Sequence, residues 1–436
     1  MAASSVAAAV SSGVACEQPR CCHASCAGLH GAAPWYHANV PWGLPKLLMA
    51  RGLRGASAGQ KALASLWRQP PGAGPGQTWS GPALSCGLAA PDASAFAAWL
   101  GSRQAHRGVV EMLGAGAAAE LSHKGRLAAY LASHGLSAWA PPTARSAREL
   151  EAGGRLEAED RGDRRLWFLK HAEVDGNAGV TVHRGRAACS AAWLAAGEEA
   201  GKYVAQPEVA DPLLDELGRK VTLRVFVLVA AIVDSAEDGA TRLAWAHVRR
   251  EFLCRKHPKP YDSQDPDLGR HVHSAVGEFE GVACELGSHW PHRECTWPAI
   301  RQLLTECLEP FLPKLARSKE VPQPDGTGAL EFDLLGVDVL VDARFRPWFI
   351  EVNLLPALSP VHGDTAATAH REAVVEDVLA IVLDPALRSG CLRTALAPGH
   401  AWEQLACWEE RQGAGLQCHT LDSFALCTDT DTPASN

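Results

Sequence analysis

Two apolar runs joined by a short polar turn, within residues 334–353, constrain the fold of this chain more than any other feature. The turn falls at residues 343–346, so folding the segment there places Asp338 opposite Glu351. Because side chains alternate along a strand, Asn353 lies on the same face as Glu351. The opposite face carries three valines: Val337, Val339 and Val341. The segment therefore predicts a β-hairpin with three oxygen-bearing side chains on one face.

These three side chains predict a magnesium site. Two carboxylates this close repel each other unless a cation lies between them. Ligation by a few oxygen atoms, with room left for phosphate groups, suits Mg²⁺ better than zinc. The alternative is an ordinary hairpin whose acids face water, because antiparallel sheets often expose one face to solvent.

The same hairpin resembles one in a known enzyme family. Gly336–Asp342 followed by Arg346–Ser359 is similar to the metal-binding hairpin of the tubulin–tyrosine ligase-like enzymes, which are ATP-grasp ligases. The resemblance implies an α/β (α+β) ATP-grasp fold, in which antiparallel-rich sheets with flanking helices form a nucleotide cleft between lobes. It also implies ATP and Mg²⁺ as cofactors, with the metal of Mg·ATP held by Asp338, Glu351 and Asn353.

Composition limits the class of protein. The chain has 436 residues, enough for two or three packed units, and a net charge of −8, without the basic excess of a general nucleic-acid binder. Its longest strongly apolar run, Val225–Val233, is too short to span a bilayer and predicts a buried strand. The 14 cysteines are scattered, which favours reduced thiols in a cytosolic compartment. We expect neither nucleic acid nor a membrane as a partner.

The beginning of the chain carries two alternatives to plain disorder. A group of metal-binding side chains lies there, without a second ligand pair at the usual spacing: Cys16, Cys21, Cys22, His23 and Cys26. The Ala/Ser-rich, acid-poor composition is compatible with an organelle transit peptide, although Arg20 is the only Lys or Arg before Lys46. A disordered leader is the simplest expectation.

The resemblance extends almost continuously from about residue 121 to residue 384, with amphipathic helices expected at Leu121–Gly135 and His370–Leu383. It divides the chain into a disordered leader at 1–40, an N-terminal lobe at 41–115, a central ATP-grasp lobe at 116–205, a C-terminal ATP-grasp lobe with the metal hairpin at 206–385, and a C-terminal extension with a disordered tail at 386–436.

A strand, a glycine-containing loop and a second strand follow one another between Leu166 and His183. A loop of this kind can fold over phosphates and offer them backbone N–H groups. The alternative is a plain hairpin with a surface lysine, since glycine marks turns generally. The resemblance implies five nucleotide contacts in and beyond this unit: Lys170, Gly176, Gly179, Gln206 and Lys220.

Residues 220–229 alternate between polar and apolar side chains. Lys220, Thr222 and Arg224 share one face of the predicted strand, so three polar groups point together above the sheet. The alternative is a solvated sheet face. In the family that this strand resembles, the pattern is Lys-x-Asp-x-Arg, which implies that Arg224 faces the transferred phosphoryl group. Residues 245–255 likewise resemble the segment with a second active-site arginine, here Arg255.

Residues 242–259 form the most basic stretch of the chain, with six Lys or Arg residues against the single acid Glu251. An acidic peptide tail is a natural partner for such a patch. The alternative is a solvated charged face.

The resemblance implies an ATP-dependent ligase that joins a carboxylate to an amine through an acyl-phosphate. Lys170 and Lys220 would bind phosphates, and Arg224 and Arg255 the phosphoryl and acyl-phosphate oxygens. We expect addition of glutamate, or of glycine or tyrosine, to protein tails. Tubulin or microtubules, bound through acidic C-terminal tails, and a free amino acid are the expected partners. The expected location is the cytoplasm, the cytoskeleton or the base of a cilium or flagellum.

Five positions depart from the family pattern. Thr222 stands in place of an aspartate, Asn177 and Phe252 in place of glycines, His171 in place of a proline and Ser274 in place of an asparagine. Two other hypotheses therefore stay open. One is a catalytically weak or inactive ATP-grasp protein that acts as a microtubule or cilium scaffold, and the other is an ATP-grasp enzyme for small molecules.

Overall fold

The computed structural model describes most of the chain from residue 118 onward. Backbone and side chains are described for residues 118–152, 165–172, 179–233, 240–272, 284–318, 330–354, 356, 358, 365–382 and 401–411, and several further strand residues are described by their backbone alone.

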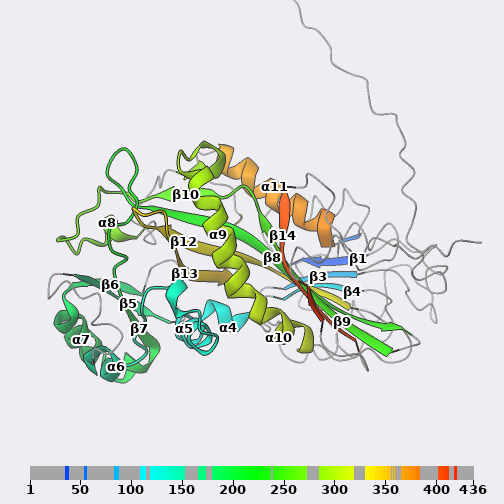
Figure 1. Ribbon diagram of the computed structural model, residues 1–436, viewed down its shortest axis with the longest axis horizontal. Helices are drawn as coiled ribbons and strands as arrows, with labels where there is room; N and C mark the ends of the chain where they lie inside the picture. The colour runs from blue at the N-terminus through cyan, green and yellow to red at the C-terminus, as the bar shows by residue number, and fades with distance from the viewer. Residues whose placement is uncertain are drawn as a thin grey trace, which may run out of the picture.

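Twelve strands form one large sheet with the order β15-β14-β9-β8-β12-β4-β3-β1-β2, in which β10 and β11 extend from β8 and β13 pairs with β12 (Figure 1). The strands are β1 (Trp35–Ala38), β2 (Arg54–Gly55), β3 (Ala83–Gly87), β4 (Val109–Leu113), β8 (Val221–Ala236), β9 (Gly239–Arg249), β10 (Leu253–Lys256), β11 (Cys284–Leu286), β12 (Ala329–Val341), β13 (Pro347–Leu354), β14 (Trp402–Arg411) and β15 (Gln417–His419). Pairing is antiparallel from β15 through β12, whereas β1, β2, β3 and β4 run parallel to one another and β4 joins β12 in parallel.

A second sheet of three antiparallel strands, β6-β5-β7, lies beside the large one. Its strands are β5 (Leu166–His171), β6 (Val180–Arg184) and β7 (Tyr203–Pro207), and its helices are α6 (Ala147–Ala152) and α7 (Arg186–Ala195). Trp167 and Leu169 of β5 pack with Trp193 of α7 and Leu150 of α6 in a separate small core. The small sheet therefore has a core of its own.

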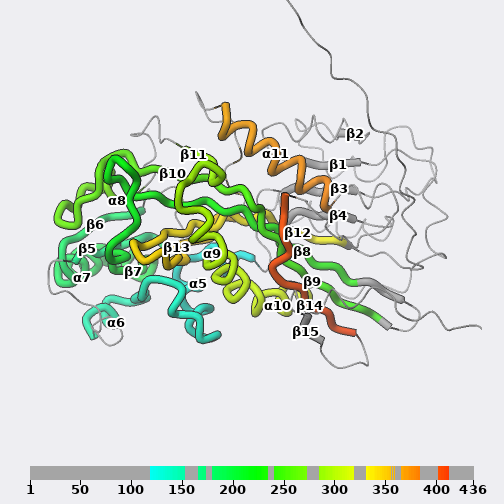
Figure 2. The backbone as a smooth tube through the Cα atoms, turned by 45° about the horizontal axis from the view of Figure 1, so that its top comes forward, coloured from blue at the N-terminus to red at the C-terminus, as the bar shows by residue number. Residues whose placement is uncertain are grey.

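Helices cover both faces of the large sheet (Figures 1 and 2). On one face, the valines of β8 and β12 pack against α9 (Arg293–Leu308) and α10 (Leu312–Arg317). On the other face, Phe226 and Leu334 pack against α11 (Thr365–Val382). The described part of β8 is buried along its length as a result. These antiparallel sheets with flanking helices confirm the predicted fold class.

The remaining helical segments are short: α4 (Ala119–Ser122), α5 (Lys124–Ser133), α8 (Leu268–His271) and the 3₁₀ turns Ser137–Trp139, Gly197–Lys202, Gly287–His289 and Glu309–Phe311. The prediction of a single helix over Leu121–Gly135 is wrong in one respect, because the observed helix is interrupted at His123. The backbone of His123 is extended, and its Nδ1 accepts hydrogen bonds from the N–H groups of Gly125 and Arg126, so it caps a new helix. Gly135, at φ 74°, ends this region as expected.

Several strands were not predicted from the sequence. β14 and β15 lie in the expected C-terminal extension, and β1 falls within residues 1–40, which were expected to be disordered. The cysteine group before residue 27 and the tail after residue 419 lie outside the described residues. In the part of the chain that the structure describes, no helix is long and apolar enough to cross a membrane.

Candidate active site

The hairpin of β12 and β13 has the predicted register. Asp338 pairs with Glu351, and Gly336 pairs with Asn353. A bulge follows, because Val339 pairs with Phe349 and skips one residue of β13. The predicted turn at 343–346 is confirmed.

The turn is closed by the residue that precedes it. One carboxylate oxygen of Asp342 accepts hydrogen bonds from the backbone N–H groups of Arg344 and Arg346, and the other accepts one from the indole of Trp348. Phe345, at φ 64°, completes the tight geometry. Because turn geometry fixes hairpin register, Asp342 helps to hold the two acids of the site opposite each other.

Asp338 is buried and held by two neighbours. Arg224 donates two hydrogen bonds to it. Nε lies 2.5 Å from Oδ1, and Nη2 lies 2.9 Å from Oδ2. Nδ2 of Asn353 lies 3.4 Å from Oδ2 of Asp338 and 3.2 Å from the carbonyl oxygen of Gly336. At Gly336 a side chain would collide with its surroundings, since a Cβ there would lie 2.6 Å from Cβ of Pro356. Arg224 and Asp338 thus form a bidentate pair on adjacent strands.

Glu351 lies at the wall of the pocket, with 21% of its side chain exposed and Lys124 of α5 at 3.7 Å. Burial, and then the neighbouring Asp338 carboxylate, raise the pKa of the Glu351 carboxyl, while Lys124 and Lys170 oppose that shift. Lys124 was not among the predicted site residues. It lies within the segment Leu121–Gly135, for which the sequence predicted a helix but no site residue.

The donor set of this hairpin fits a magnesium ion. Asp338 and Glu351 offer hard carboxylate oxygens, and Asn353 offers an amide oxygen. The pKa of Glu351 is raised by burial and then by repulsion from Asp338, and a cation would relieve that repulsion. Among the described residues, no group of three or more His, Cys, Asp or Glu side chains could hold a metal. The trio has only two carboxylates, so a metal there would need oxygens from a substrate as well.

Lys170 reaches the same pocket from β5 of the small sheet. Its Nζ donates to Oε1 of Gln206 at 2.7 Å, and Gln206 in turn donates to Thr143. Burial lowers the pKa of Lys170 to about 8, against the opposing effect of Glu351. Gly179 closes the strand pair, since its carbonyl oxygen accepts from the N–H of His171 at 2.8 Å. Gly176 and Asn177, in the loop between β5 and β6, lie outside the described residues.

Lys220, at the start of β8, is buried between a carboxylate and an imidazole. Its Nζ lies 2.5 Å from Oε1 of Glu208 and 3.2 Å from Nδ1 of His271. Burial lowers the pKa of Lys220, and Glu208 opposes that shift. Burial alone would raise the pKa of Glu208, but the neighbouring His271 and the Lys220 ammonium hold it below its usual value. Glu208 was not found by sequence reasoning.

The polar face of β8 is buried, so the alternative of a solvated face is wrong. Thr222 meets His257 at 2.9 Å between Oγ1 and Nε2, at the position where the family pattern has an aspartate. Arg255 pairs with Thr222 in the β10–β8 ladder and is buried. Burial, and then the positive charge of Arg224, lower the pKa of Arg255 to about 10. Two arginines therefore lie near the Asp338 carboxylate.

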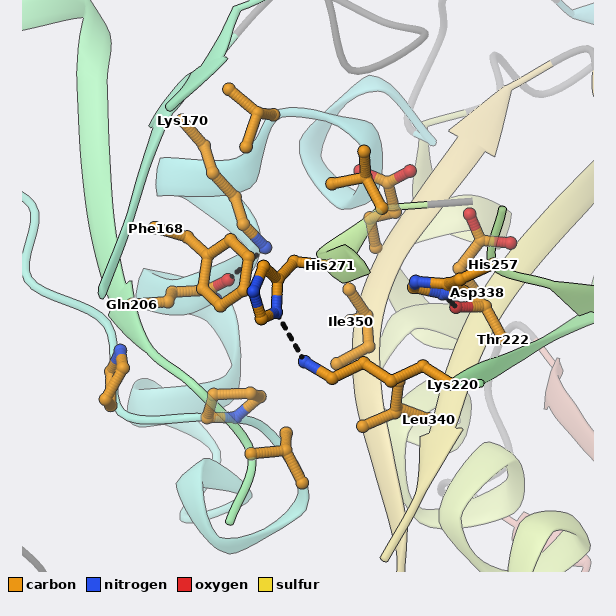
Figure 3. Close-up of a pocket in the computed structure, with 16 residues that line it drawn as sticks. Phe168, Lys170, Gln206, Lys220, Thr222, His257, His271, Asp338, Leu340 and Ile350 are labelled. Atoms are coloured by element: carbon orange, nitrogen blue, oxygen red, sulfur yellow. Dashed lines mark hydrogen bonds between the residues drawn. The ribbon is translucent and has the colours of Figure 1, made fainter. Parts of the chain in front are cut away.

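Figure 3 shows the pocket into which these groups point, between the small sheet and the β8–β12–β13 part of the large sheet. Its lining combines apolar and charged side chains: Pro141, Phe168, Lys170, Val180, Gln206, Pro207, Val209, Lys220, Thr222, His257, His271, Val272, Asp338, Leu340, Ile350 and Glu351. Five predicted site residues thus line one pocket, and Arg224 and Asn353 contact one of them, Asp338.

The basic stretch at 242–259 is not a continuous free patch. Its charges pair with acids of other elements, in the pairs Arg242–Glu410, Arg249–Asp377, Arg250–Glu403, Lys256–Glu285 and Lys259–Asp267. The interpretation of this stretch as a docking surface for an acidic tail is therefore not supported by its surroundings, because most of its charge is compensated within the chain.

Phe252, which stands where the family pattern has a glycine, points away from the pocket into the core. Its ring stacks on Trp297 at 5.7 Å and meets Trp290 edge-on at 6.0 Å. Gly287 lets the ring approach, since a Cβ there would lie 2.7 Å from it. This departure fills the core, and Phe252 does not line the pocket.

Comparisons with known proteins agree with this geometry. Residues 314–391, which include the hairpin, match the sequence model of the tubulin-tyrosine ligase family. The chain is 27% identical over 219 residues to a probable tubulin polyglutamylase, TTLL2, of Mus musculus, covering 47% of this chain and 38% of that protein. It is 25% identical over 170 residues to the tubulin polyglutamylase ttll6 of Danio rerio, covering 36% and 21%. It is 26% identical over 130 residues to the tubulin monoglycylase TTLL3 of Danio rerio, covering 30% and 15%. The chain thus spans less than two fifths of the length of each of these relatives.

Proposed function

We propose that the chain, whose residues 314–391 match the tubulin-tyrosine ligase family, is an ATP-dependent carboxylate–amine ligase that adds an amino acid to a protein tail. The observation that carries the proposal is the meeting of Asp338 and Glu351 with Lys170 and Lys220 in one pocket between two sheets. Acids paired with several cations in a half-apolar cleft suit a nucleotide and its metal.

The reaction that fits this site has two steps. A carboxylate oxygen attacks the γ-phosphorus of ATP, the bond to ADP breaks, and an acyl-phosphate forms. An amine nitrogen then attacks the acyl carbon, phosphate leaves with the bonding electrons, and the amine loses a proton. The protein has to place the phosphoryl group and neutralise its developing charge.

The residues of the chain divide that work. Asp338, Glu351 and Asn353 would hold Mg²⁺, which when bound supplies positive charge to phosphate oxygens. Lys170 and Lys220 would bind the nucleotide, and Arg224 and Arg255 would contact the phosphoryl and acyl-phosphate oxygens. Gln206 fixes Lys170 by a hydrogen bond, and Arg224 is fixed by Asp338. Gly176 and Gly179 would approach the phosphates with their backbone.

We propose tubulin as the protein substrate and glutamate as the first amino acid to test. The support is that two of the relatives named above are polyglutamylases by name and one is a monoglycylase. The names of all three give tubulin as the protein that is modified, while the added amino acid differs among them.

The test is to incubate the full chain with ATP, Mg²⁺, microtubules and isotopically labelled glutamate, glycine or tyrosine. Mass spectrometry of the tubulin tails should show a mass increase for one of the three amino acids, with one ADP released per amino acid added. Absence of incorporation with all three, together with absence of ADP release, would overturn the ligase proposal.

One observation favours a second candidate, an inactive nucleotide-site protein that acts as a microtubule scaffold. Thr222 and His257 form a buried hydrogen-bonded pair where the family pattern has an acid, so the site has one carboxylate fewer. This candidate predicts sedimentation of the chain with microtubules without any ADP release. Calorimetry that detects no Mg·ATP binding would select it over the ligase.

The lowered pKa of Lys170 predicts a pH dependence of nucleotide affinity. Phosphate groups favour the protonated lysine, so affinity should be highest below about pH 8 and should fall as pH rises through that value. We expect ATP affinity to drop about tenfold between pH 7 and pH 9.5 in calorimetric titrations. The matched variant Lys170→Arg keeps its charge over this range, so its affinity should be nearly constant. An equal pH dependence in both proteins would contradict the assignment.

A further inference from the structure

Glu208 lies beside the pocket, between two residues that line it, Pro207 and Val209, and the residue roles given above do not include it. It directly follows β7, and its backbone is fixed to the start of β5. Its N–H donates to the carbonyl oxygen of Leu166 at 2.9 Å, and its own carbonyl oxygen accepts from Arg165 at 2.6 Å. Its buried carboxylate pairs with Lys220 at 2.5 Å. Since Lys220 directly precedes β8, this ion pair joins the small sheet to the large one.

The same ammonium also holds His271 of α8. Nε2 of His271 lies 2.5 Å from the carbonyl oxygen of Asp265, so Nε2 carries the hydrogen and Nδ1 accepts from Lys220. The ring of Tyr261 lies 4.5 Å from the ammonium nitrogen. Figure 3 shows Lys220 and His271 pointing toward each other in the pocket. Two of the three N–H groups of Lys220 are thus used within the chain, which leaves one for a ligand.

The two ends of the pocket differ in charge. At one end, the carboxylate of Glu208 neutralises Lys220, whose Nζ also lies 4.5 Å from the centre of the Tyr261 ring. At the other end, two carboxylates, Asp338 and Glu351, are surrounded by a larger number of cations: Lys124, Lys170, Arg224 and Arg255. An anionic group of a ligand is therefore favoured at the second end, where positive charge is in excess.

We propose that Glu208 is a positioning residue that holds Lys220 as a neutral pair, so that this end of the pocket contacts an uncharged part of the nucleotide, its base or ribose. The triphosphate then lies toward Lys170 and Arg224. The inference rests on the proposed nucleotide binding, and it moves Lys220 from the phosphate contact expected from the sequence to a contact with the nucleoside.

Calorimetric titration of adenosine, and separately of ATP with Mg²⁺, tests this placement. Glu208→Gln keeps the size of the side chain but removes its charge, so Lys220 loses its counter-ion and its fixed position. Because both ligands contain the nucleoside, we expect both to bind at least about tenfold more weakly, by a similar factor. Glu199→Gln, which removes an exposed acid paired with Lys202, should leave both affinities unchanged.

A double variant keeps the test sharp if Glu208→Gln folds poorly. Glu208→Gln with Lys220→Met removes both charges, so no buried charge stays uncompensated. The ratio of ATP affinity to adenosine affinity should then equal that of the wild type within about threefold. A selective loss of ATP affinity in the double variant, or a selective gain of ATP affinity in Glu208→Gln, would place Lys220 on the phosphates and overturn the inference.

Two further outcomes separate this inference from the function on which it rests. Unchanged affinities for both ligands in Glu208→Gln would overturn the inference alone, because the wild type would still bind nucleotide. A wild-type chain that binds neither adenosine nor ATP would overturn nucleotide binding itself, and the inference with it.

Discussion

Replacing Glu351 with glutamine is expected to abolish ligation while the protein stays folded. Glutamine has nearly the same shape but lacks the charge that would hold a magnesium ion between this residue and Asp338. Losing a group that stabilises charge in a transition state costs about 100- to 1,000-fold in rate, and loss of a metal ligand should reach the upper end of that range. The measurement is the rate of ADP release and of labelled amino-acid incorporation at saturating ATP.

Stability separates this result from simple unfolding. Burial and the repulsion from Asp338 already raise the pKa of Glu351, so a neutral side chain removes an unfavourable interaction. The melting temperature of Glu351→Gln should equal or exceed that of the wild type. Glu149→Gln, at an exposed pair with Arg145, is the matched control and should keep full activity. Ligation by Glu351→Gln within tenfold of the wild-type rate would remove the hairpin from the catalytic site.

The hairpin could be predicted because its information is local. A period of two along each strand, interrupted by one polar turn, determines both the register and the face of Asp338, Glu351 and Asn353. The same alternation predicted that Lys220, Thr222 and Arg224 share a face. In both cases the structure places these residues as the periodicity requires.

The partners of these residues could not be predicted, since they come from distant segments. Glu351 meets Lys124, which lies at the start of a helix early in the described chain, and Lys220 meets Glu208 across a turn between two sheets. The periodicity of a sequence does not predict such side-chain contacts, because they depend on how whole helices and sheets pack. The assignments of Lys170, Gln206 and Arg255 came from the family resemblance, and their roles stay predictions.

The basic stretch at 242–259 also shows that distant partners cannot be predicted from local sequence. Counting charge along 242–259 predicted a free patch, but β14 supplies Glu403 and Glu410 to it, and β14 itself was not predicted. A strand from late in the chain, such as β14 between β9 and β15, can thus neutralise charge that a linear reading assigns to a binding surface. Charge runs are informative only once the neighbouring strands are known.

Replacing Asp338 with alanine is expected to be the most destabilising single change in the site. Arg224 and Asp338 are 5% and 1% exposed, so the variant leaves a buried guanidinium without its carboxylate. Breaking a buried pair from one side costs about 3–5 kcal/mol of unfolding free energy. The neighbouring Arg255 adds to that cost, because Asp338 also offsets its charge.

Urea denaturation followed by circular dichroism measures this loss. Glu149→Ala breaks an exposed pair whose side chains are 50% and 46% exposed, and it should cost less than about 1 kcal/mol. A double variant, Arg224→Met with Asp338→Leu, removes both charges and should recover most of the stability. An unfolding free energy of Asp338→Ala within about 1 kcal/mol of the wild-type value would contradict this prediction. Arg224 would then have another counter-charge, and Asp338 could bind a metal without first leaving the arginine.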